Sequence, residues 1–178
     1  MHRLPIACSL VLLFSGTVAL SPVTPAAETT AMVSTLNKAD ADFVSSALLA
    51  GLAEVKTSEL ALKRGLTGTD RDFAKMIVDD HSAVNDELKS IAKTKMVAIP
   101  TALDEKQQAK LDELGKKNDA DFPAAYFAYQ VSAHKAAVSA FTETSDNAKD
   151  VDVKAFATKH LGALQTHLVQ AKALAAKY

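Results

Sequence analysis

The sequence predicts an all-α protein: an antiparallel four-helix bundle of the ferritin-like kind, with an additional short helix between the second and third long helices. Hydrophobic residues make up 48% of the 178 residues, whereas only 6 Gly and 5 Pro are present to form turns. Apolar residues recur every three or four positions along four long segments, which is the period of an amphipathic helix. Four apolar stripes of this kind bury one another most simply in an antiparallel bundle.

The first two long helices are predicted at 37–64 and 70–95. Gly65 is expected to follow the end of the first helix, because glycine adopts the left-handed backbone conformation that commonly terminates helices. Thr69 or Asp70 is expected to cap the start of the second, since a side-chain oxygen at that position accepts hydrogen bonds from free backbone N–H groups.

The remaining helices are predicted at 104–117, from about 121 onward, and at 152–177. The first of these is the short additional helix. Pro123 fits the second, because proline is tolerated in the first turn of a helix. The stretch "SDNAKD" at 145–150 is expected to be the turn between the last two helices.

The first 27 residues are predicted to be a secretory signal peptide followed by a leader of small residues. Arg3 precedes the apolar run "LPIACSLVLLFSGTVAL", and "SPVTPAAE" comes next, an order that is typical of exported proteins. Cleavage is expected after Ala19 or near Ala26 and Ala27, so the boundary falls between 19 and 27.

Residues 28–36 are expected to be a flexible mature N-terminus, and residues 37–178 the bundle domain. After removal of the signal, no apolar run approaches the length of a membrane span. The protein is therefore expected in the periplasm or outside the cell, and outer-membrane association is a further expectation. The 20 basic and 21 acidic residues are mixed along the chain, so no nucleic-acid-binding face is predicted.

The histidines of the predicted bundle fall near the middle of the long helices. His81 and His134 are close to the centres of the second and third, and His160 and His167 flank the centre of the fourth. If the four helices run up, down, up and down, these side chains and Glu54 of the first helix lie within about 12 Å along the bundle axis. Inward imidazoles and a carboxylate can hold a divalent transition metal, namely Zn, Cu, Mn or Fe. The alternative is that each histidine bonds a neighbouring polar group and only packs the core.

His160 and His167 are seven residues apart, about 10 Å along a helix, so one of the two is expected to lie outside the coordination sphere of a single ion. Burial disfavours a charged imidazole, and the pKa values of the inward histidines are therefore expected to be depressed. No Glu in the sequence is followed by His three residues later, which disfavours a di-iron site. Nucleophile and phosphate-loop motifs are also lacking, so binding is expected rather than turnover, with a metal-dependent oxidase as a third alternative.

Several long segments resemble a bacterial family, the domain of unknown function 4142. They are "DADFVSSALLAGLAEVKTSELALKRG", "DFAKMIVDDHSAVNDELKSIA", "IPTALDEKQQAKLDEL", "DFPAAYFAYQVSAHKAAVSAF" and "VKAFATKHLGALQTHLVQAKAL", which together cover nearly all of 37–175. The resemblance implies an exported ferritin-like bundle and no established activity. The residues that match its motifs are Glu54, Asp80, His81, Asn85, His134 and His167, whereas His160 departs from the pattern.

We therefore expect an exported bundle that binds a metal ion or small ligand through its inward side chains. The expected metal ligands are His81, His134, His167 and Glu54, and the outer or alternative ligands are His160, Asp80 and Asn85. The alternative function is a metal-free structural or interaction protein of the bacterial envelope, with an envelope protein or a second copy of the chain as its partner.

Overall fold

The structure, a computed structural model, describes residues 34–178, which form five helices and no strand. This confirms the predicted all-α class. The helices are α1 (Lys38–Lys63), α2 (Gly68–Thr94), α3 (Glu105–Gly115), α4 (Phe122–Asn147) and α5 (Val151–Ala175). None of the described helices is both long and apolar enough to cross a membrane.

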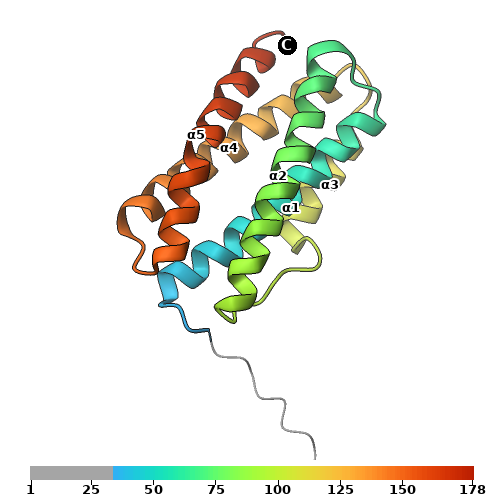
Figure 1. The fold of residues 1–178 in the computed structure, drawn as a ribbon. Coiled ribbons are helices and arrows are strands. Elements are labelled where there is room, and N and C mark those ends of the chain that lie inside the picture. The colour runs from blue at the N-terminus through green and yellow to red at the C-terminus, as the bar shows by residue number, and fades with distance from the viewer. Residues whose placement is uncertain (1–33) are drawn as a thin grey trace, which may run out of the picture. The chain divides into compact units, whose positions relative to one another are not determined.

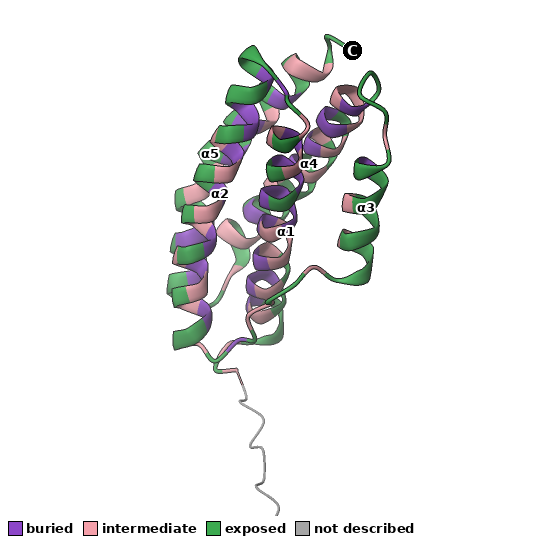
Figure 2. Cartoon of the chain, turned by 90° about the vertical axis from the view of Figure 1, so that its right-hand side faces the viewer, coloured by how far each residue is buried: buried purple, intermediate pink, exposed green. Residues whose placement is uncertain are grey.

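The four long helices form a bundle of two hairpins, α1 with α2 and α4 with α5 (Figure 1). The hairpins meet through α1 against α4 and α2 against α5, while α3 lies beside α1 and α4 (Figure 2). Each packed neighbour is antiparallel. Asp40 near the start of α1 accepts a hydrogen bond from the Lys149 N–H after the end of α4, and Lys95 after the end of α2 binds Asp150 at the start of α5. The predicted antiparallel four-helix bundle is confirmed.

The order of helix directions differs from the expected one. The segment that contains α3 carries the chain back along the bundle, so that α4 runs in the same direction as α2 (Figure 1). The four long helices therefore run up, down, down and up. A residue at the middle of a helix stays at the middle of the bundle whichever way that helix points, so the expected common height of the histidines does not depend on this order.

The predicted start of α2 is wrong by two residues. Thr67 occupies the N-cap position, and α2 begins at Gly68. Asp70 is not the cap because its carboxylate binds the C-terminal residues Lys177 and Tyr178. The prediction for Gly65 is confirmed, since its φ is +81° just beyond α1.

The predicted turn at 145–150 is too long. α4 continues to Asn147, so the connection to α5 needs only three residues. Two carboxylates make so short a turn stable. Asp40 accepts from the N–H groups of Lys149 and Asp150, and the Asp150 side chain caps α5.

The predicted signal peptide, 1–27, and residues 28–33 of the predicted flexible N-terminus lie outside the described residues. The rest of that N-terminus, 34–36, is held against the end of α2. There the Thr35 N–H donates to the Lys95 carbonyl over 3.0 Å, and the Ser34 hydroxyl donates to the same oxygen over 3.1 Å.

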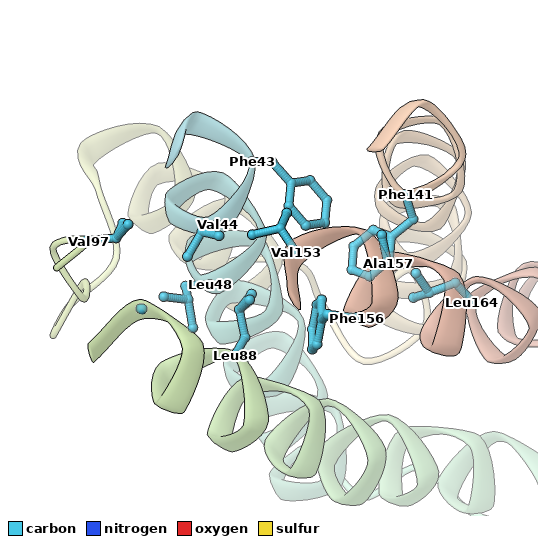
Figure 3. Close-up of a cluster of buried hydrophobic side chains, with 11 residues drawn as sticks. Phe43, Val44, Leu48, Leu88, Val97, Phe141, Val153, Phe156, Ala157 and Leu164 are labelled. Atoms are coloured by element: carbon cyan, nitrogen blue, oxygen red, sulfur yellow. The ribbon is translucent and has the colours of Figure 1, made fainter. Parts of the chain in front are cut away.

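Two apolar clusters form the core, one toward each end of the bundle. The first, shown in Figure 3, brings together Phe43, Val44, Leu48, Leu88, Ala92, Val97, Phe141, Val153, Phe156, Ala157 and Leu164. The second consists of Ala61, Leu66, Phe73, Ala74, Ile77, Leu114, Phe122, Tyr126, Phe127 and Ala171. Along each long helix the two clusters are separated by a buried polar residue: Glu54, His81, His134 or His167. The site lies in this polar layer.

Candidate metal centre

Three histidines from three helices meet in the polar layer. His81 on α2, His134 on α4 and His167 on α5 each offer one potential ligand atom, and these atoms lie within 4.8 Å of one another. The ring centroids are 5.3 to 5.6 Å apart. All three side chains are buried, with residue exposures of 5% or less.

His81 is oriented by Glu54 of α1. Its Nδ1 lies 2.7 Å from the Glu54 Oε2, and a carboxylate oxygen accepts, so Nδ1 carries a proton. The other ring nitrogen, Nε2, is buried and has no hydrogen-bond partner.

The other two histidines are held in the same manner by different acceptors. The His134 Nδ1 donates to the Gln130 carbonyl, one helical turn earlier, over 3.0 Å. The His167 Nε2 donates to the Asp80 Oδ2 over 3.1 Å. The remaining nitrogens, Nε2 of His134 and Nδ1 of His167, are buried without a partner.

Each imidazole thus has one nitrogen bonded to an oxygen acceptor and one nitrogen unpaired in the polar layer. Histidines that bind metals show this division, because the outer acceptor fixes the tautomer and directs the lone pair of the other nitrogen at the ion. The arrangement is chemically suited to hold one ion on three nitrogen ligands.

The charges of the metal-free cluster are unequal. Burial opposes a positive charge on His81, but the adjacent Glu54 carboxylate outweighs burial and raises the pKa of His81. Burial lowers the pKa of His134, and burial together with the neighbouring His81 and His134 lowers the pKa of His167. Burial by itself would raise the pKa of Glu54, yet the nearby histidines lower it. The expectation of a depressed pKa for every inward histidine is therefore wrong for His81, because an ionised carboxylate faces it.

Glu54, the expected fourth ligand, lies beside two of the histidines, and its Oε1 is buried without a hydrogen-bond partner. Its carboxylate faces the Nδ1 atoms of His81, at 2.7 Å, and His134, at 3.4 Å, whereas the unpaired nitrogens of these rings are the Nε2 atoms. The ligand-atom group found among the described residues contains the three histidines alone. In the metal-free protein Glu54 is a buried carboxylate that orients His81.

The structure separates the three outer or alternative ligands. Asp80, on the surface of α2, bonds His167. Asn85 is 7% exposed and lies one turn beyond His81 on the same helix. His160 is not part of the cluster. Its ring packs on Phe156 with centroids 4.6 Å apart, and its Nε2 lies 3.0 Å from the Glu87 carboxylate.

A comparison with known protein families identifies the family to which the chain belongs. The model of the domain of unknown function DUF4142 matches residues 24–174. The chain belongs to this family. No curated protein matches it significantly.

The bundle is also similar to a solved structure from another family. A crystal structure of a DUF305 fragment from Deinococcus radiodurans superposes with a TM-score of 0.71 and 11% sequence identity, over 80% of this chain and 99% of that one. At so low an identity the likeness shows the shared helical-bundle fold alone.

A buried polar network beside the cluster was not predicted from the sequence. Gln130 is fully buried, and its amide donates to the Ser58 hydroxyl over 3.2 Å and to the Thr57 hydroxyl over 3.4 Å. The Ser58 and Tyr126 hydroxyls are 2.8 Å apart. One signal was present in the sequence: Gln130 precedes His134 by one turn and so shares its inward face. The network fixes the turn of α4 that contains Gln130, whose carbonyl accepts the hydrogen bond from His134.

Proposed function

We propose that this DUF4142 protein is an exported binding module that holds one divalent transition metal on His81, His134 and His167. A single observation carries the proposal. One potential ligand atom of each of three buried histidines lies within 4.8 Å of the other two, and each ring has one buried nitrogen without a partner and one nitrogen bonded to an oxygen acceptor.

A purely structural role accounts poorly for this geometry. A buried polar atom without a partner costs about 1–3 kcal/mol, and core histidines that only pack would be expected to satisfy both nitrogens. Three unpaired nitrogens in one cluster of rings add three such costs. A bound cation satisfies all three at once.

The ligand chemistry narrows the choice of ion. Neutral imidazole suits Zn, Cu, Mn or Fe, whereas Mg²⁺ prefers oxygen ligands. Bonds from imidazole nitrogen to zinc are about 2.0–2.1 Å long, so the ligand atoms, which lie within 4.8 Å of one another, must draw closer together to bind one ion. Three protein ligands leave a coordination position for an exogenous molecule, which the ion would bind and polarise as a Lewis acid.

Metal-dependent stabilisation tests the proposal. The chain is stripped with a chelator and its melting temperature is followed during titration with Zn²⁺, Cu²⁺, Mn²⁺, Fe²⁺ and Mg²⁺. An ion at 100 times its dissociation constant adds about 2.7 kcal/mol to the free energy of unfolding, which corresponds to a rise of about 5–11 °C. At least one transition metal is expected to produce this rise, and Mg²⁺ none.

The matched pair of variants is His134→Leu and His160→Leu. The first removes a proposed ligand and is expected to abolish the rise. The second removes a histidine of the same bundle that lies outside the cluster, and is expected to leave the rise unchanged. If no transition metal raises the melting temperature, the alternative function, a metal-free structural or interaction protein of the envelope, takes precedence.

Export belongs to the same proposal and rests on the apolar N-terminal segment and the small residues that follow it. Fractionation of cells that express the full chain is expected to recover it from the periplasm or the medium, with an N-terminus between residues 20 and 28. An intact N-terminus on protein recovered from the cytoplasm would refute export.

A further inference from the structure

A cavity of about 920 Å³ adjoins the histidine cluster. It lies between α1, α2, α4 and α5, and residues 106, 107 and 110 of α3 contribute to its rim. This volume is at the upper end of the range for pockets that bind drug-sized molecules. The cavity contacts Glu54, His81 and His167, so it approaches the proposed metal site from one side.

Small residues line much of the cavity. α4 alone contributes Ala133, Ala136, Ala137 and Ala140. Leucine at the half-buried positions Ala133 and Ala137 would occupy part of this space. Beyond the histidines the wall includes larger apolar side chains, namely Phe43, Leu88, Phe141 and Leu164. Farther from the histidines the polar residues Asp40, Asp42, Glu143, Thr144 and Asn147 also line the cavity. The cavity therefore has an apolar section between its histidine end and an outer polar end.

Asn85 stands where the histidine end meets the apolar section. It is 7% exposed, it lines the cavity, and its amide forms no side-chain hydrogen bond within residues 34–178. Gly51 leaves room for it, because a Cβ at Gly51 would lie 2.2 Å from the Asn85 Oδ1. An amide that faces a cavity and has no side-chain partner is a recognition group for a polar ligand atom.

The length of the apolar section follows from helix geometry. Leu88 lies seven residues beyond His81, and Phe141 lies seven beyond His134, which places each about 10 Å along its helix from the cluster. An extended chain of about eight carbons spans this distance.

We propose that the cavity binds a carboxylate with an unbranched alkyl chain of this length. The carboxylate would complete the coordination of the metal and accept a hydrogen bond from the Asn85 amide, while the chain lies along the alanines toward Phe141 and Leu164. The proposal rests on the proposed metal site. Away from the histidines the lining carries Lys106 and Lys110 as well as Asp40, Asp42 and Glu143, so the attraction for a carboxylate must come from the ion.

The test uses the full chain loaded with Co²⁺, whose visible spectrum changes when a new ligand enters the coordination sphere. Acetate, butanoate, hexanoate and octanoate are titrated in turn, and the dissociation constants are checked by calorimetry. Full burial of a methylene strengthens binding about fourfold. The constant is therefore expected to fall at least about a hundredfold from acetate to octanoate.

Three kinds of variant locate the binding. Ala137→Phe and Ala133→Leu fill the cavity and are expected to remove the gain with chain length while acetate still binds. Ala128→Leu, at an exposed position of the same helix, is the matched control and is expected to keep the gain. Asn85→Ala is expected to weaken acetate and octanoate alike by about 10- to 100-fold, because it removes a hydrogen bond to a charged group.

The outcomes separate the two proposals. If Co²⁺ binds but acetate and octanoate bind equally, the carboxylate proposal is overturned and the metal site stands. If the filled variants keep the gain with chain length, the chain lies elsewhere and the proposal is also overturned. If wild-type protein binds no Co²⁺, Zn²⁺, Cu²⁺, Mn²⁺ or Fe²⁺, the metal site itself is refuted, and the carboxylate proposal with it.

Discussion

The substitution His134→Leu tests whether the histidine cluster serves binding at the expense of stability. In the metal-free protein His134 is fully buried, and its Nε2 has no partner. Leucine has a similar volume and no polar atom. A side chain that is present for packing would be harmful to replace, whereas a metal ligand is expected to be replaceable without loss as long as no metal is present.

The expected change in the free energy of unfolding follows from the two ring nitrogens of His134. Removing the unpaired Nε2 recovers about 1–3 kcal/mol, and losing the hydrogen bond from Nδ1 to the Gln130 carbonyl costs about 1 kcal/mol. The Gln130 carbonyl still accepts the backbone N–H four residues later in α4, so the substitution leaves no new buried acceptor without a partner. The free energy of unfolding of the metal-free variant is therefore expected to rise by about 0–2 kcal/mol, or about 0–8 °C in melting temperature.

Urea denaturation in the presence of chelator measures this change, with equal slopes required for the comparison. Phe127→Ala, a truncation in the apolar core of the same helix, is the reference and is expected to cost about 3–5 kcal/mol. A loss of more than about 2 kcal/mol for His134→Leu would refute the reasoning, because it would place His134 among residues that hold the bundle together.

Three further results are expected. The stability of the metal-free protein, measured by urea melts from pH 5 to 9, should be greatest near pH 6.5. The raised pKa of His81 gives stability that is lost as pH rises above 6.5. The lowered pKa values of His134 and His167 give stability that is lost as pH falls below 6.5. A steady rise across this range would contradict the ion pair. Metal affinity, measured by calorimetry, should weaken as pH falls, because His81 must release a proton to bind, and a pH-independent affinity would exclude His81 as a ligand. Gly51→Ala should destabilise the wild type through its clash with Asn85, yet stabilise an Asn85→Ala background by up to about 1 kcal/mol. Thermal melts of the wild type, the two single variants and the double variant measure both effects. Equal effects of Gly51→Ala in the two backgrounds would mean that the two side chains do not touch.

Much of the fold was predictable because helix formation depends mainly on residues three or four positions apart in the sequence. The three- and four-residue spacing predicted all five helices, and Gly65 marked the end of the first. The failures occurred where a distant group decides the local structure. Asp70 lost its expected capping role to the C-terminal Lys177 and Tyr178, and the turn before α5 is shortened by Asp40 from the start of α1.

The common height of His81, His134 and His167 was also determined by the sequence, since a residue near the middle of a helix remains at the middle of the bundle in either direction. The rotation of each helix about its axis was not. That rotation depends on how all the apolar stripes pack together. It decides which ring nitrogen of His81 contacts Glu54 and that His160 bonds Glu87 outside the site. The sequence determined which side chains lie at the same height in the bundle, and tertiary packing alone decided which of their atoms are in contact.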